Sequence, residues 1–238
     1  MPTSTCVCTN WFTLSEALSA TLHKRLMRKR RAVRQTREVK VDVKTLDGQE
    51  LTWDAATEPV GSALRIAPAF VATATDAALG VKTTLTARYV RGEGRYVIKV
   101  VTNTAIREDV EVNYPTVAKV GMQAIVQMAA PRCIFLTLED EDDPNATWLS
   151  VDQLTTSGGR ILPPMLAAEV VKRGAGEARM EVVELLYGSA ALAGLPPAKL
   201  LQQELGIPHR TASQWIIDAR KAGRLEGMKY HAGRPAGG

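Results

Sequence analysis

The residues of this chain with the clearest chemistry lie close together, between positions 209 and 221. The polar side chains of this segment are those of His209, Arg210, Thr211, Ser213, Gln214 and Arg220. Arginine and glutamine form paired hydrogen bonds with the edges of guanine and adenine, and most of these groups also hydrogen bond to phosphate oxygens. A short segment with this set of side chains favours contact with a nucleic acid.

The apolar residues around them repeat at the spacing of a helix. In segment 209–221 they are Ala212, Trp215, Ile216 and Ala219, and in segment 197–205 they are Leu200, Leu201 and Leu205. Residues three or four positions apart share one helical face, so each segment should form an amphipathic helix. Gly206 lies between the segments, and glycine readily ends a helix in the left-handed conformation. The pattern predicts two helices joined by a tight turn.

These helices resemble a known DNA-binding motif. The stretch from Gly206 to Ile216 resembles the glycine-hydrophobic-serine-x-x-threonine-alanine-x-x-tryptophan-hydrophobic core of helix-turn-helix proteins that are common in actinobacteria and their phages. Two residues depart from that core: Gln202 stands where the first helix usually has a small alanine, and Pro208 stands where the serine or threonine N-cap usually lies. The resemblance covers about the last quarter of the chain. It implies a helix-turn-helix that binds DNA; a plain helical hairpin is the alternative.

On this interpretation the helix at about 209–221 enters the major groove of double-stranded DNA. The expected base contacts are His209, Arg210, Ser213 and Gln214, with Arg210 suited to guanine and Gln214 to adenine. The expected phosphate contacts are Lys199, Thr211, Arg220, Arg224 and Lys229. Trp215 and Ala212 should hold the helices together and contact no base.

A third helix should precede the pair, because two helices alone cannot bury both apolar stripes. Segment 177–187 has the required pattern, with a shared face formed by Met180, Val183, Leu186 and Tyr187. We expect a three-helix domain at 177–228, followed by a basic flexible tail at 229–238.

The N-terminal end of the chain is strongly basic. Between Lys24 and Lys40 nine basic residues face Glu38 alone, a net charge of +8; the whole chain has +5, so the remainder sums to −3. Thr13 and Glu16 have capping-box spacing, and leucines then recur every fourth residue, which predicts an amphipathic helix from about Leu14 to Arg34. The possible DNA contacts of this arm, residues 1–37, are Arg28, Lys29, Arg30, Arg31 and Arg34.

Other interpretations of the arm stay open. The helix could dock on the protein's own core or on a second subunit, or it could lie on a membrane surface. Met27 could also be the true start of the protein, which would make residues 1–26 an artefact of the assigned gene start.

Residues 38–173 are predicted to form a β-rich central domain. Val39, Val41 and Val43 alternate with polar residues, the turn residues Asp47 and Gly48 follow, and the alternation resumes at Leu51 and Trp53, which predicts a first hairpin. Two runs rich in β-branched residues flank 92–94, which predicts a second hairpin with a glycine turn.

Further segments complete the predicted central domain. Core segments are expected at 110–112, 124–128 and 133–138, and the last should be central in its sheet because it is almost wholly apolar. The five carboxylates at 139–143 favour a solvated loop, since they lack the spacing of a calcium loop. A short linking helix is expected at 165–172, and the glycines at 174–176 are the expected domain boundary.

The sequence offers little for catalysis. The three histidines are scattered at 23, 209 and 231, and Cys133 lies alone in an apolar segment, far in sequence from Cys6 and Cys8. No nucleophile motif, metal motif or cofactor loop is present, so we expect no catalytic residue, no metal and no cofactor. No apolar run is long enough for a membrane span and no signal peptide is evident, so a soluble, cytoplasmic protein is expected.

The sequence therefore predicts an α+β chain with a basic N-terminal helix, a β-rich central domain and a C-terminal three-helix domain with a helix-turn-helix. Its predicted function is sequence-specific binding of double-stranded DNA as a transcriptional regulator, with a homodimer expected because one such motif reads few base pairs. The alternative is an interaction module that binds a protein or an effector and holds polyanions through the basic arm. An enzyme acting on DNA is a third hypothesis.

Overall fold

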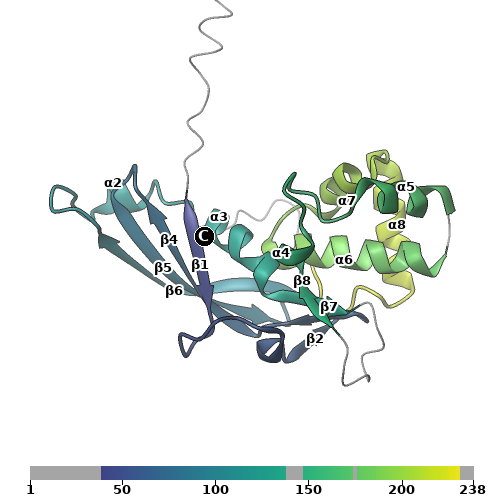
Figure 1. The fold of residues 1–238 in the computed structure, drawn as a ribbon, viewed down its shortest axis with the longest axis horizontal. Helices are drawn as coiled ribbons and strands as arrows, with labels where there is room; N and C mark the ends of the chain where they lie inside the picture. The colour runs from purple at the N-terminus through teal and green to yellow at the C-terminus, as the bar shows by residue number, and fades with distance from the viewer. Residues whose placement is uncertain (1–38, 138–146, 174–175, 231–238) are drawn as a thin grey trace, which may run out of the picture. The chain divides into compact units, whose positions relative to one another are not determined.

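The computed structural model describes residues 39–137, 147–173 and 176–230 of the chain (Figure 1). The predicted N-terminal arm with its five candidate contacts, the acidic segment 139–143 and the tail from 231 onward lie outside the described residues. The described part is α+β, as predicted, with two four-stranded antiparallel sheets and a group of helices toward the C-terminus.

The first sheet contains the longest strands and has the order β1-β4-β5-β6. Its strands are β1 (Lys40–Lys44), β4 (Ala69–Asp76), β5 (Val81–Val90) and β6 (Arg95–Ala105). Residues of β5 alternate between the core and the solvent, with Leu85 buried and Arg88 exposed. The predicted second hairpin is confirmed, since β5 pairs with β6 and Gly94 adopts a φ of 62° in the turn between them.

The predicted first hairpin is wrong in its pairing. Strand β1 pairs along its length with β4, and its link to the following segment is a single bridge between Lys44 and Glu50. Trp53 lies in the short 3-10 helix η1 (Trp53–Ala55) instead of a second strand. All five residues of β1 pair with β4, whereas a local hairpin would pair few of them. Pairing with β4 therefore satisfies more backbone hydrogen bonds, although β4 lies farther away in the sequence.

The second sheet is smaller and has the order β2-β3-β7-β8. Its strands are β2 (Glu58–Val60), β3 (Leu64–Ile66), β7 (Ile134–Thr137) and β8 (Trp148–Ser150). Strand β7 lies between β3 and β8, and Ile134, Phe135 and Leu136 are all buried, which confirms the predicted central position of this apolar segment. The Tyr96 hydroxyl of the first sheet donates to the Ala67 carbonyl at 2.7 Å, beside β3, and so ties the two sheets together.

Two of the predicted core segments are not strands. Residues 124–128 lie in helix α3 (Met122–Ala129), which buries Ile125, Val126 and Ala129 on one face. Residues 110–112 belong to no strand and precede the short helix α2 (Tyr114–Val117). A short apolar run fits a buried helix as well as a strand, so its length alone does not decide between them.

Short helices join the second sheet to the C-terminal helices. Helix η2 (Ala130–Arg132) precedes β7, and α4 (Val151–Leu154) follows β8 directly. Ser150 caps α4 reciprocally with Gln153. The predicted linking helix is present as α5 (Pro164–Arg173).

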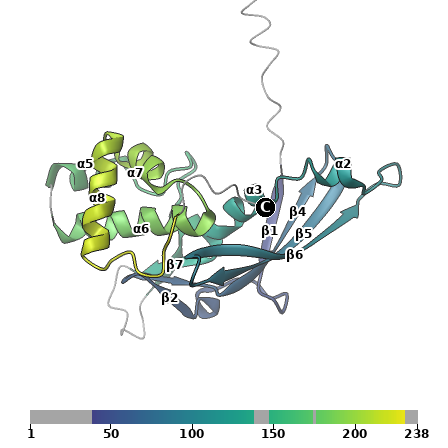
Figure 2. The same ribbon diagram turned by 180° about the vertical axis from the view of Figure 1, so that it is seen from behind.

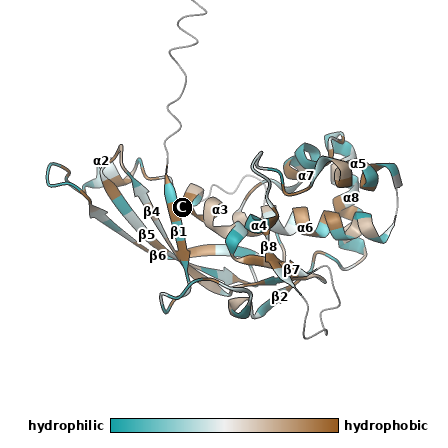
Figure 3. Ribbon diagram, in the orientation of Figure 1, coloured by the Kyte–Doolittle hydropathy of each residue, from teal (hydrophilic) through white to brown (hydrophobic). Residues whose placement is uncertain are grey.

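Helix α6 (Glu177–Ala193) runs through the group of C-terminal helices, with α7 and α8 beside it (Figures 1 and 2). The prediction ended this helix at 187, but it continues to 193, and all of its residues from 182 onward are buried. A helix that is apolar all round belongs inside a core rather than at its surface. Figure 3 shows the difference from α5, α7 and α8, which carry hydrophilic stretches beside hydrophobic ones.

The core is continuous from the sheets to the C-terminal helices. The described residues from Val39 onward belong to one compact unit. Phe70 of the first sheet, Val170 of α5 and Val183 of α6 are members of the same hydrophobic cluster. The helical part predicted at 177–228 therefore does not stand apart from the β-rich part.

A buried carboxylate joins α6 to the second sheet. Glu184 is fully buried, and its carboxylate accepts hydrogen bonds from the Ala63 N–H at 2.9 Å, the Ser62 hydroxyl at 2.6 Å and the Ser62 N–H. These donors belong to the turn between β2 and β3, where Gly61 adopts a φ of 70°. Arg224 Nη1 approaches the same carboxylate at 3.8 Å, so positive charge also offsets its burial.

We predict that Glu184→Ala destabilises the protein strongly. The substitution leaves the Ser62 and Ala63 N–H groups without their acceptor; these donors are only partly buried, so each loss should cost about 1 kcal/mol, the lower end for an unsatisfied donor, and the cavity left at the fully buried Glu184 adds to it. Urea unfolding followed by circular dichroism measures the change. Glu181→Ala, on an exposed position of the same helix, is the matched control, with an expected change within about 0.5 kcal/mol. Equal stability of the two variants would rule out the structural role of Glu184.

Candidate nucleic-acid interface

The two predicted helices and their turn are present. Helix α7 (Pro197–Leu205) ends at Gly206, which adopts a φ of 66°, and helix α8 (His209–Lys221) begins after Pro208. Pro208 provides no side-chain cap, but its carbonyl accepts from the Ala212 N–H at 3.0 Å. The substitution of the usual N-cap by proline therefore leaves the start of α8 intact.

The apolar stripe of α8 holds it against α6 and α7. Ala212 and Ala219 are fully buried, and Trp215 and Ile216 are less than a tenth exposed. The Arg179 guanidinium of α6 lies 5.1 Å from the centre of the Trp215 ring and pairs with Asp218 of α8 at 4.0 Å. Trp215 and Ala212 thus occupy the packing positions that the sequence predicts for them.

The other face of α8 is open and carries the predicted base contacts. His209, Arg210 and Gln214 are exposed, and Thr211 and Ser213 are partly exposed. Among the described residues Arg210 makes no hydrogen bond and no ion pair, so its guanidinium is available to a partner. Gln214 donates to Asp218 at 2.9 Å, and Ser213 lies 3.5 Å from the Nδ1 atom of His209.

Two exposed residues of this face, Ile217 and Lys221, are not among the contacts that the sequence predicted. Ile217 is 42% exposed and follows Arg210 by seven positions, and Lys221 is exposed one turn later. The helical spacing from Arg210 through Gln214 is the signal that could have found them. An exposed isoleucine between polar groups can contact the methyl group of a thymine.

Basic side chains of α7 and α8 line a hollow beside this face. The hollow has a volume of about 360 Å³, and its lining includes Lys199, His209, Arg220, Tyr187 and Tyr230. Arg220 donates to the Tyr187 hydroxyl at 3.0 Å, and its guanidinium lies 5.8 Å from the centre of that ring. Lys199 and Arg220 are both exposed. The hollow thus has two permanent positive charges in its lining, Lys199 on α7 and Arg220 in the last turn of α8, and a phosphate contact requires such groups.

The remaining predicted phosphate contacts are used within the protein. Arg224 binds Glu184, Glu177 and the Ser62 hydroxyl, and its side chain is 24% exposed. Lys229 lies against the turn between β5 and β6, where its backbone N–H donates to Gly94 at 3.3 Å and its ammonium to Gly92 at 3.4 Å. Lys199, Thr211 and Arg220 are therefore near the exposed face of α8, whereas Arg224 is bound to Glu184, Glu177 and Ser62.

A second buried glutamate fixes the position of α7. Glu204 is 4% exposed, and its carboxylate accepts from the N–H groups of Ile161 at 3.2 Å and Leu162 at 3.1 Å. Arg160 Nε lies 3.7 Å from the same carboxylate. The segment before α5 therefore anchors helix α7.

Residues typical of catalysis or metal binding are not gathered here. Within the described residues no three His, Cys, Asp or Glu side chains are grouped as a metal site. Burial raises the pKa of the Cys133 thiol well above its usual value, so this cysteine is a poor nucleophile. Among the helices that the structure describes, none combines the length and the apolar character needed to cross a bilayer.

Comparison of the chain with models of known protein families, with curated proteins and with solved structures finds no match. The function of the exposed face of α8 must therefore be inferred from the geometry and chemistry of its own residues.

We predict that Gly206→Ala destabilises the turn by about 1 kcal/mol. No atom lies within 4 Å of a Cβ added at this position, so the cost comes from the left-handed backbone and not from a clash. Gly206→Asn is the matched control, because asparagine adopts this conformation more readily than alanine. Thermal unfolding of the two variants measures the difference, and an alanine variant as stable as the asparagine variant would contradict this account of the turn.

Proposed function

We propose that this protein binds double-stranded DNA in a sequence-specific manner and acts as a transcriptional regulator. The observation that supports the proposal is the exposed face of α8, where Arg210 has no partner among the described residues and lies beside Gln214 and Ser213. The helix packs through its opposite face on α6 and α7, so the polar face is free to enter a major groove. The cytoplasm is the compartment that this function implies.

In this proposal each side chain of the face has a chemical role. Arg210 makes a paired hydrogen bond with guanine and Gln214 with adenine, while His209 and Ser213 adjust the preference and Ile217 contacts a thymine methyl group. Lys199, Thr211 and Arg220 hold phosphates on either side of the groove. The basic residues of the arm, from Arg28 to Arg34, add phosphate contacts that are independent of sequence. Arg224 is left out, because its guanidinium is occupied within the protein.

We predict that Arg210→Ala weakens binding to the preferred sequence by about 1–3 kcal/mol, because a bidentate contact to guanine is lost. The preferred sequence comes first from selection of bound molecules out of random duplex DNA at near-physiological salt. Fluorescence anisotropy then compares the variant on selected and random duplexes. Arg88→Ala, which removes an exposed arginine of β5, is the control and should retain both the affinity and the preference.

Two outcomes would contradict the proposal. Selection without an enriched motif, with binding at low salt alone, would mean that charge and not base contacts holds the DNA. Equal losses on selected and random DNA for Arg210→Ala would remove Arg210 from the base contacts.

The proposal includes a second copy of the chain, and we assign its contact to the outer edge of β6. This strand has eleven residues and forms one edge of the first sheet. Between Tyr96 and Ala105 its one charged residue is Lys99. The opposite edge strand, β1, has five residues, of which Lys40, Asp42 and Lys44 are charged. Long, weakly charged edges favour pairing with another strand, whereas short, charged edges oppose it.

We predict that Val100→Lys converts a dimer into a monomer. Val100 is 54% exposed on β6, and a lysine there places charge at the proposed contact. Sedimentation velocity at the concentrations used for DNA binding measures the change. Thr86→Lys is the control, since Thr86 lies opposite Val100 on the interior strand β5, and it should leave the dimer intact. A wild-type protein that sediments as a monomer on a single half-site would remove the dimer from the proposal.

A further inference from the structure

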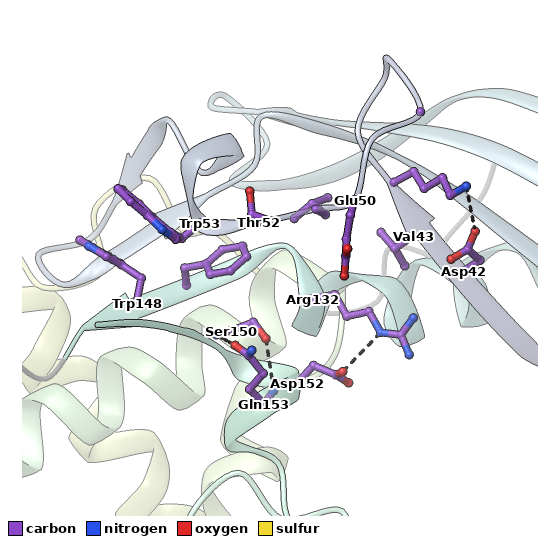
Figure 4. Close-up of a pocket in the computed structure, with 14 residues that line it drawn as sticks. Asp42, Val43, Glu50, Thr52, Trp53, Arg132, Trp148, Ser150, Asp152 and Gln153 are labelled. Atoms are coloured by element: carbon purple, nitrogen blue, oxygen red, sulfur yellow. Dashed lines mark hydrogen bonds and ion pairs between the residues drawn. The ribbon is translucent and has the colours of Figure 1, made fainter. Parts of the chain in front are cut away.

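A cleft of about 700 Å³ opens between the two sheets, on residues that the proposed DNA contact does not use (Figure 4). Strand β1 and residues 48–53 form one wall, and β8 with α4 forms the other. Phe135 of β7 also lines the cleft and is almost fully buried. This volume is typical of a site for a small organic molecule.

Two tryptophans from distant parts of the sequence meet in this cleft. The rings of Trp53 and Trp148 are nearly parallel, with 12° between their planes and 6.3 Å between their centres. The guanidinium of Arg65 lies 5.1 Å from the centre of the Trp148 ring. Trp53 is 49% exposed, although burial of this ring would favour folding. The cleft therefore presents the Trp53 ring to solvent, and the Trp148 ring stacked beside it contacts the planar cation of Arg65, a residue outside the cleft lining.

The charges of the cleft are balanced except for one carboxylate. Lys44 lies 3.8 Å from Asp42, and Arg132 lies 3.3 Å from Asp152. Arg132 also donates to the Val41 carbonyl at 2.9 Å, so it is held in place within the wall. Glu50 lines the cleft, and its carboxylate forms no ion pair or hydrogen bond with the residues that the structure describes. One negative charge is left for a ligand to neutralise.

The neutral polar groups of the cleft are partly engaged. The Ser150 hydroxyl accepts from the Gln153 N–H at 3.2 Å, and the Gln153 side-chain oxygen accepts from the Ser150 N–H at 2.8 Å. The amide nitrogen of Gln153 remains as a donor, and on the opposite wall the Thr52 hydroxyl donates to Asp54 at 3.5 Å and can still accept a hydrogen bond. The groups of the protein that are left for a ligand in the cleft are thus an aromatic face, the Glu50 carboxylate, the Gln153 amide nitrogen and an acceptor on the Thr52 hydroxyl.

We propose that this cleft binds a small organic cation with a flat aromatic body. The flat part would stack on the exposed Trp53 ring, and the cationic group would pair with Glu50. Aromatic faces attract cations, and tryptophan does so most strongly. The proposal does not depend on DNA binding, because none of the lining residues belongs to α7 or α8.

Benzamidine is a suitable probe, because it combines a planar ring with a planar cation. The full chain labelled with ¹⁵N is titrated with it, and the indole N–H resonances of Trp53, Trp148 and Trp215 are followed by two-dimensional NMR. We expect saturable shifts for Trp53 and Trp148 and none for Trp215, which lies in α8. Benzamide, which has nearly the same shape without the charge, should produce much weaker shifts.

Two variants test the assigned contacts. Glu50→Gln should weaken benzamidine binding about three- to tenfold by removing the charge partner. Glu108→Gln, which neutralises an exposed carboxylate outside the cleft lining, should leave the binding unchanged. Trp53→Ala should weaken binding as followed at Trp148, whereas Tyr114→Ala, an 85% exposed aromatic outside the cleft, should not.

The proposal is overturned if benzamidine shifts neither tryptophan of the cleft. It is also overturned if benzamide binds equally well, or if Glu50→Gln binds like the wild type while its circular dichroism spectrum is unchanged. Loss of the DNA preference in Arg210→Ala, or its absence in the wild type, does not bear on these results.

Discussion

The buried carboxylate of Glu184 is the constraint on which most of the described structure depends. A carboxylate inside an apolar core is tolerated when hydrogen-bond donors and positive charge surround it. The turn between β2 and β3 provides the donors, and Arg224, which follows α8, provides the charge. Glu184 therefore joins the second sheet, the central helix α6 and the end of the helix-turn-helix at one point.

Glu204 has a similar role on the other side of the motif. It binds the backbone of the segment before α5 through Ile161 and Leu162, while Glu184 binds the β2–β3 turn. The helix pair is thus attached to the rest of the protein through two buried acids. Hydrogen bonds to a charged acceptor are stronger than neutral ones, so these contacts favour one fixed position of α6 and α7, on which α8 packs.

The basic residues of the C-terminal helices fall into two groups, those that pair with acids of the protein and those that do not. Arg224 and Arg179 face acids of the protein itself, and burial strengthens these contacts. Arg210 and Lys199 remain exposed and unpaired within the described residues. Two basic side chains of the α7–α8 pair are therefore available to a partner, and the unpaired Glu50 carboxylate lies in a separate cleft between the sheets.

The sequence by itself determined helices α7 and α8 and the turn between them, because the signals are local: the apolar spacing around Trp215, the conformational freedom of Gly206 and the polar face of α8 all lie within one short segment. It also determined the β5–β6 hairpin through the glycine turn. The tertiary structure alone decided that β1 pairs with β4, that residues 124–128 form a helix and that Arg224 joins Glu184. It also brought Trp53 beside Trp148. These outcomes depend on partners far away in sequence, whose contact energies no local pattern contains.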